Sequence, residues 1–143
     1  MKRNLLFAGA LLTTVLFASA QEDAEDQAER SVQSGVYTEE QAQRGSATFE
    51  GTCLACHQPE EFGDGAYIDG WSGQTAHDLI EHIRATMPED NPGSLKRKEY
   101  VDVVAYFFWM NGLPAGDEEM DANSVKRIRI EGPYRPGLDS FSR

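Results

Sequence analysis

Small and apolar residues recur at helical spacing in three stretches of the chain, residues 38–51, 75–87 and 94–111. The first stretch places Ala42, Gly45 and Phe49 on one face of a helix. The third is apolar nearly all round from Val101 to Met110, which indicates burial on more than one side. No stretch alternates convincingly, as a half-buried strand does. The pattern therefore predicts an all-α fold with three main helices.

Local signals mark where these helices begin. Thr38 with Gln41, and Thr75 with Asp78, have the three-residue spacing of a capping box. Ser94 is a suitable N-cap for the third helix. Within the first helix Gly45 is unexpected, because an interior glycine costs about 1 kcal/mol relative to alanine. We interpret it as a point where the third helix approaches closely.

The segments after the first and third helices are predicted to be loops and extensions. Residues 58–74 are rich in glycine, proline and aspartate and predict a long loop with little regular structure. Residues 121–130 are predicted to form a short helix, with Met120, Val125 and Ile128 packing on the main domain. This C-terminal part is interpreted as a wrapping extension, and a docking segment for a partner is the alternative.

The N-terminal twenty residues have the pattern of a secretory signal peptide. Lys2 and Arg3 precede an apolar run from Leu5 to Phe17, and Ala18–Ala20 forms a small-residue cleavage site. The run is shorter than the ~20 residues of a membrane-spanning helix, which disfavours the alternative of an anchor. We therefore expect a periplasmic or otherwise exported protein with no membrane span after cleavage. The predicted organisation is 1–20 signal peptide, 21–36 acidic disordered leader, 37–115 helical domain and 116–143 C-terminal extension.

The charge of the chain limits its partners. Residues 1–20 carry Lys2, Arg3 and no acid, so their removal changes the formal net charge from −11 to −13. Such a surface disfavours nucleic acid, whose phosphates need basic side chains, and anionic membranes. It permits a basic redox partner, although plain solubility explains the charge equally well.

The chemistry of the chain centres on Cys53-Leu-Ala-Cys56-His57, the attachment signature of a c-type haem. Two thiols at this spacing can form thioethers with the two vinyl groups of one haem, and His57 offers its imidazole to the iron. The alternatives are a disulfide, a thioredoxin-like redox pair and half of a zinc site. A zinc site lacks ligands, because the chain has no other cysteine and only His77 and His82 besides.

Met87 is the candidate for the sixth iron ligand opposite His57. Pro88 pushes Met87 out of helical geometry, so Met87 begins a loop with its thioether free to point inward. Met1 leaves with the signal peptide, and Met110 lies within the apolar third helix. Methionine/histidine ligation is the arrangement of electron-transferring cytochromes. An iron with an open sixth position is the alternative.

Three ordered motifs resemble the class I (monohaem) cytochromes c over about residues 37–115. They are Arg44-Gly45 with Phe49 and Cys53–His57, then Trp71 with Thr75–Pro88, then Asn91-Pro-Gly-Ser-Leu with Glu99–Tyr106. The resemblance implies three main helices around one covalent haem c, held by Cys53, Cys56, His57 and Met87. It implies that Gly45 and Phe49 cross the last helix near Tyr106. The sequences of the last two motifs also resemble those of small cytochromes associated with quinoprotein dehydrogenases.

The resemblance implies an electron-transfer protein rather than an enzyme. Its partners would be redox proteins, with a dehydrogenase and an oxidase as candidate classes. Two alternatives stay open: a dedicated electron-transfer subunit of a periplasmic dehydrogenase, such as a quinoprotein, and an open-iron haem sensor or enzyme. One departure concerns His57. Members of the family often have a proline some ten residues after the histidine, whose carbonyl orients the imidazole, but residues 63–67 contain none. We expect another backbone carbonyl to accept from His57.

Overall fold

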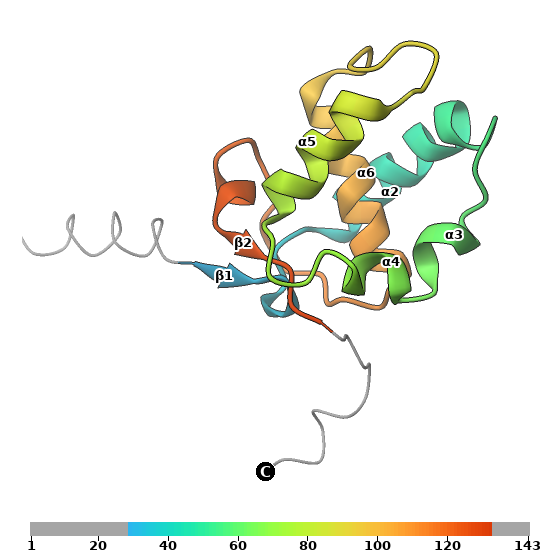
Figure 1. Ribbon diagram of the computed structural model, residues 1–143. Helices are drawn as coiled ribbons and strands as arrows, with labels where there is room; N and C mark the ends of the chain where they lie inside the picture. Colours follow the sequence, from blue (N-terminus) through green and yellow to red (C-terminus); the bar gives the residue numbers. More distant parts are fainter. Residues whose placement is uncertain (1–28, 133–143) are drawn as a thin grey trace, which may run out of the picture.

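The longest helix, α6 (Arg97–Met110), runs through the middle of the fold, and α2 (Glu39–Thr48) and α5 (Ala76–Thr86) pack against it (Figure 1). The computed structural model describes residues 29–132. Eight of the fourteen residues of α6 are buried, as its nearly continuous apolar run predicts. The predicted all-α fold with three main helices is confirmed. None of the helices in the described range is long and apolar enough to cross a membrane.

Helices α2 and α6 meet backbone to backbone at Gly45. A Cβ atom added there would lie 1.9 Å from the Asp102 carbonyl oxygen and 2.9 Å from the Tyr106 Cβ. Both distances are far inside van der Waals contact, so only glycine permits this crossing. The interpretation of Gly45 as a close-approach residue is confirmed, and so is its contact with the region of Tyr106.

The first two helix starts follow the sequence signals. Thr38 caps α2 by accepting from the Gln41 N–H, and Thr75 caps α5 in a complete capping box with Asp78. Ser94 is not the N-cap of α6, because Lys96 takes that position two residues later. Residues 91–94 instead close a turn, with the Ser94 N–H donating to the Asn91 carbonyl at 3.2 Å. Glu99 then accepts from the Lys96 N–H at 2.7 Å at the true start of α6.

The stretch 58–74 has more regular structure than predicted. It contains two short helices, α3 (Glu60–Gly63) and α4 (Ala66–Asp69). Both are single turns, too short to show helical periodicity in the sequence. They are held from α6, where the Asn111 side chain donates to the Phe62 carbonyl at 2.7 Å and accepts from the Gly65 N–H at 2.9 Å. The expectation of a long irregular loop is therefore corrected.

The two terminal segments of the described chain pair with each other. Strands β1 (Arg30–Ser31) and β2 (Ile128–Arg129) run parallel, with Arg30 opposite Ile128. A 3₁₀ turn, η1 (Val32–Ser34), follows β1, and another, η3 (Ser124–Lys126), precedes β2. The predicted helix over 121–130 is thus wrong, and so is the expectation of no strand. Strands of only two residues are too short to show an alternation of apolar and polar side chains in the sequence. They form here because tertiary packing brings the two segments together.

The C-terminal end of the predicted leader is part of the folded domain. Val32 and Val36 are fully buried, so residues 30–36 are ordered and not part of a disordered leader. Both side chains belong to the same buried cluster as Val125 and Ile128 of the C-terminal segment. Residues 21–28 of that leader, the predicted signal peptide and residues 133–143 lie outside the described residues.

Gln41 fastens the C-terminal segment to α2. Its side-chain amide donates to the Met120 carbonyl at 2.9 Å and accepts from the Met120 N–H at 2.8 Å, while also donating to Asp102 at 3.1 Å. The side chain is therefore fully used inside the protein and does not complete the predicted capping box with Thr38. A buried amide with all these partners stabilises the segment, because each lost partner would leave a buried polar group unpaired.

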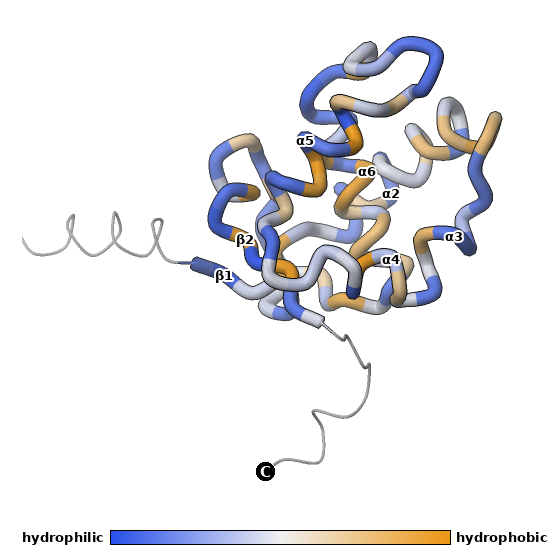
Figure 2. The backbone as a smooth tube through the Cα atoms, in the orientation of Figure 1, coloured by the Kyte–Doolittle hydropathy of each residue, from blue (hydrophilic) through white to orange (hydrophobic). Residues whose placement is uncertain are grey.

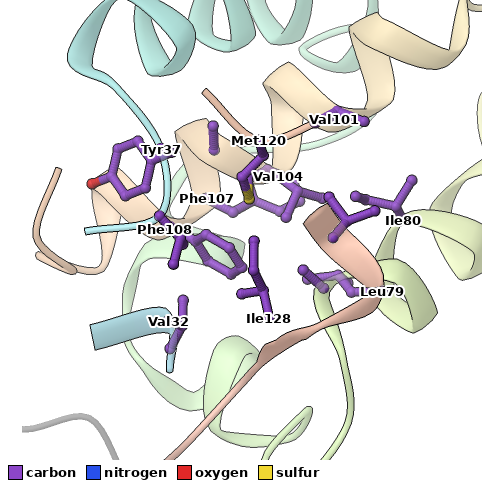
Figure 3. Packing of buried hydrophobic residues seen from close by; sticks show 14 of the residues in the cluster. Val32, Tyr37, Leu79, Ile80, Val101, Val104, Phe107, Phe108, Met120 and Ile128 are labelled. Carbon is purple, nitrogen blue, oxygen red and sulfur yellow. The ribbon is translucent and has the colours of Figure 1, made fainter. Parts of the chain in front are cut away.

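The core lies where α5, α6 and the terminal segments converge. Figure 2 shows the hydrophobic parts of the backbone gathered there and hydrophilic loops at the periphery. Figure 3 shows Met120 and Ile128 from the C-terminal segment among side chains of α5 and α6. Met120, Val125 and Ile128 are all buried, as predicted for packing on the main domain.

We predict that Gly45→Ala will destabilise the protein strongly, by about 3 kcal/mol or more, because the new methyl group overlaps the Asp102 carbonyl and must push α2 from α6. Denaturant unfolding measures the effect. Gly51→Ala is the matched control, since a Cβ there meets nothing within 4 Å, and it should change stability by less than about 1 kcal/mol. Equal midpoints for the two variants would show that the crossing is looser than described.

We also predict an acid-dependent contribution from Glu119. Hydrogen bonds from Lys98 and Arg44 lower the pKa of Glu119 below its ordinary 4.5. A lowered pKa in the folded state means that the carboxylate stabilises the protein above pH 4.5 and loses this effect as the pH falls through the folded value. The Glu119 side chain is 39% exposed, so the contribution should stay below about 1 kcal/mol.

Denaturant unfolding of Glu119→Gln between about pH 3 and pH 7 tests this prediction, because that range includes the ordinary pKa of a carboxyl group. The stability difference from the unmodified protein should shrink toward acid. Glu118→Gln, at a side chain 78% exposed, is the control and should show a smaller difference. A difference that does not vary with pH would contradict the assignment.

Candidate functional site

The two cysteines lie on a single turn at the end of a π-helical segment. Helix α2 continues directly into η2 (Phe49–Cys53), a π-helical turn in which the Leu54 N–H donates to the Phe49 carbonyl. The N–H groups of Cys56 and His57 both donate to the Cys53 carbonyl, at 3.1 and 2.9 Å. The sequence did not reveal the π turn, although such turns often lie at functional sites.

Both thiols are free, with Cys53 half-buried and Cys56 exposed. Burial raises the pKa of the Cys53 thiol. A reactive redox thiol needs the opposite shift, because the thiolate is the nucleophile. This environment disfavours the thioredoxin-like alternative. Within residues 29–132 no group of three or more histidine, cysteine or acidic side chains could hold a metal ion, so a zinc site finds no further ligands there.

His57 is oriented by a carboxylate and not by the backbone carbonyl that we expected. Its Nδ1 atom lies 3.1 Å from Oε2 of Glu61, one helical turn further along the chain. The other oxygen of Glu61 accepts from the Gln58 N–H at 2.8 Å. These hydrogen bonds lower the pKa of Glu61, the Gln58 N–H most strongly. An ionised carboxylate can only accept, so Nδ1 is the donor of this hydrogen bond, and Nε2 is the ring nitrogen left to act as a ligand when the imidazole is neutral.

Helix α6 supports this segment through aromatic packing. The Phe62 ring contacts His57, with ring centroids 5.3 Å apart, and stacks on Phe107 of α6 at 4.7 Å with an interplanar angle of 6°. Asn111, which the sequence marked only as the end of a helix, anchors the backbone within α3, at Phe62, and just after it, at Gly65. The position of the His57 ring therefore depends on the C-terminal half of α6.

Met87 is placed by the other end of α6. It follows α5 in extended geometry, with φ −129° and ψ 151°, as its position before Pro88 predicts. The Tyr100 hydroxyl donates to its carbonyl at 2.9 Å, and the Gly93 N–H donates to the same oxygen at 3.3 Å. The Met87 side chain is half-buried. The hydrogen bonds from Tyr100 and Gly93 thus hold the backbone of Met87 at the start of this turn.

The other described methionines serve in packing. Met120 is 3% exposed and lies in the core. Met110 is half-buried against the core, and its sulfur lies within 4 Å of the position that a Cβ on Gly63 would take. Met87 alone of the three begins a loop.

Several large apolar side chains pack against the core but are only partly covered by protein. Between His57 and α6 in the sequence these include Tyr67, Trp71, Ile83 and Leu95. They come from α4 and the turn after it, from α5 and from the loop before α6. A flat apolar group would find both donor atoms and apolar side chains in these segments. The donor set of two free thiols, an imidazole with a free Nε2 and a thioether fits a c-type haem.

The two remaining histidines show no ligand geometry. His82 is exposed, and its ring packs against Trp71 with centroids 5.2 Å apart. His77 is half-buried, and its Nδ1 atom finds no hydrogen-bond partner among the described residues. Neither joins the group formed by Cys53, Cys56 and His57 in any contact of the described chain.

Residues 40–107 match the family model described as cytochrome C oxidase, cbb3-type, subunit III. The matched range contains both cysteines, His57, Met87 and most of α6. It supports a class I c-type cytochrome, a haem protein that transfers electrons to and from protein partners and is typically exported. It does not extend to the narrower similarity with cytochromes of quinoprotein dehydrogenases. No curated protein and no solved structure matches the chain.

We predict that Tyr100→Phe will destabilise the protein by about 1–2 kcal/mol, because the Met87 carbonyl loses a partly buried donor. Faster amide hydrogen exchange in the turn 87–95 should accompany the loss, since the Leu95 N–H also donates to this hydroxyl at 3.4 Å. Tyr106→Phe is the control, because its hydroxyl makes no hydrogen bond to the described residues. Exchange in this turn that is the same in both variants would contradict the role of Tyr100.

Proposed function

We propose that this protein is an exported c-type cytochrome that transfers single electrons between redox proteins. In this proposal Cys53 and Cys56 form thioethers with one haem c, and His57 and Met87 ligate its iron from opposite faces. The observation that carries it is the turn of Cys53–His57, with two free thiols and an imidazole whose Nδ1 is already engaged. When bound, the haem supplies an iron that alternates between the ferrous and ferric states.

The described contacts support Met87 as the second axial ligand. The alternatives Met110 and Met120 are occupied in packing. The hydrogen bonds to the Met87 carbonyl hold its backbone in place, which keeps the side chain near one position in both redox states. A ligand that moves little on electron transfer suits a carrier, because reorganisation slows the transfer.

The partner is proposed to be a protein with a basic docking surface, since the chain is strongly acidic. An oxidase and a dehydrogenase remain the candidate classes. A dedicated subunit of a dehydrogenase would need a segment free to hold the partner. Residues 120–130 are poorly suited to that role, because Met120, Val125, Ile128 and Ile130 are buried in this protein. This disfavours residues 120–130 as a docking segment, and we propose a carrier that binds its partners transiently.

Optical spectra of the purified protein in both redox states test the proposal. We expect a covalent haem that stays with the chain on denaturation, and a weak ferric charge-transfer band from the methionine–iron bond. Met87→Ala should abolish this band and allow rapid binding of carbon monoxide to the ferrous form. Met110→Leu is the matched control and should keep the band.

Two outcomes would overturn parts of the proposal. A band that survives in Met87→Ala would move the ligand to Met110 or Met120. Rapid binding of carbon monoxide or cyanide by the unmodified protein would favour an open-iron sensor or enzyme.

A further inference from the structure

The partner of His57 is the feature that the resemblance to cytochromes c did not explain. A neutral backbone carbonyl was expected at Nδ1, and the acceptor is instead the carboxylate of Glu61, at 3.1 Å. Glu61 is itself held, because its second oxygen accepts from the Gln58 N–H at 2.8 Å. The carboxylate thus bridges the imidazole and the backbone that follows it.

We propose that Glu61 is a positioning residue that orients His57 and lowers the reduction potential of the bound haem. The inference rests on the proposed function, since it concerns the iron that His57 would ligate. A hydrogen bond to a charged acceptor is roughly twice as strong as one to a neutral acceptor. A carboxylate at Nδ1 therefore gives the imidazole more anionic character and makes Nε2 the stronger donor. This donation, together with the negative charge itself, favours ferric over ferrous iron.

The contact between His57 and Glu61 is accessible to water, unlike an ion pair that is buried in a protein core. The Glu61 side chain is 50% exposed and that of His57 is 30% exposed. Pairs this accessible to water contribute little to folding stability. The effect of Glu61 should hence appear in the reduction potential much more than in unfolding, which separates a positioning role from a structural one.

The neighbouring residue provides a matched control. Glu60 precedes Glu61 in the same turn of α3 and is exposed, and no hydrogen bond or ion pair of its side chain is found within the described chain. Glu60→Gln removes one negative charge at nearly the same place without touching His57. Glu61→Gln removes the charge but keeps a neutral oxygen acceptor, and Glu61→Ala removes the acceptor as well.

The experiment measures the midpoint potential of the haem-loaded protein and its three variants at one pH and salt concentration. We expect the potential to rise in Glu61→Gln, to rise further in Glu61→Ala, and to rise least in Glu60→Gln. Proton NMR of the ferric protein should show shifted His57 ring resonances in both Glu61 variants and none in Glu60→Gln. Denaturant midpoints should be nearly the same in all four proteins.

Equal rises in potential for Glu60→Gln and Glu61→Gln, with His57 resonances unchanged, would overturn the proposal in favour of a general charge effect. A large loss of stability in the Glu61 variants, with no greater rise in potential than the control, would overturn it in favour of a structural role. Failure of the proposed function gives a different result. Unmodified protein without a methionine band overturns ligation by Met87 and leaves the Glu61 comparison readable, whereas protein without covalent haem overturns both.

Discussion

The candidate site depends on the close crossing of α2 and α6 at Gly45. Helix α2 runs directly into the π turn that carries Cys53, so the position of α2 on α6 sets where the thiols and His57 lie. Helix α6 in turn holds Met87 through Tyr100, and holds the segment after His57 through Phe107 and Asn111. One helix therefore spaces the two proposed iron ligands, and the missing side chain at Gly45 fixes its distance from α2.

A buried carboxylate strengthens this crossing on its polar side. The Asp102 side chain is only 5% exposed, and it accepts from Gln41 and from Arg44 at 3.1 Å each. Such a charge is tolerated inside a protein only when it is paired and hydrogen-bonded. The same group of residues reaches the C-terminal segment, because Arg44 also contacts Glu119 at 2.7 Å. The packing of α2 on α6 and the closure by the C-terminal segment are thus one connected arrangement.

Much of the fold and of the site could be predicted, for reasons that individual residues make clear. Gly45 was informative because an interior glycine in a helix needs an explanation, and Thr38, Thr75 and Pro88 act on their immediate neighbours. The features that were missed depend on residues distant in sequence. The Gln41 amide leaves its own helix for Met120, and the single turns α3 and α4 depend on Asn111. Glu61 could have been recognised as a partner of His57 from its spacing of four residues, which is one helical turn. It was missed because a backbone carbonyl was expected as the acceptor.

The parallel pairing of β1 with β2 also bears on the order in which the protein folds. Arg30 and Ile128 are separated by nearly the whole described chain, and the Gly116 N–H reaches back to the Tyr37 carbonyl at 2.7 Å. Contacts of such high sequence separation form slowly, since the entropy of closing a long loop must be overcome first. The contact between α2 and α6 spans a shorter stretch of chain and can form before this closure, with the Gln41 amide unpaired until Met120 reaches it. The cooperative unit is complete only once residues near 130 have joined it.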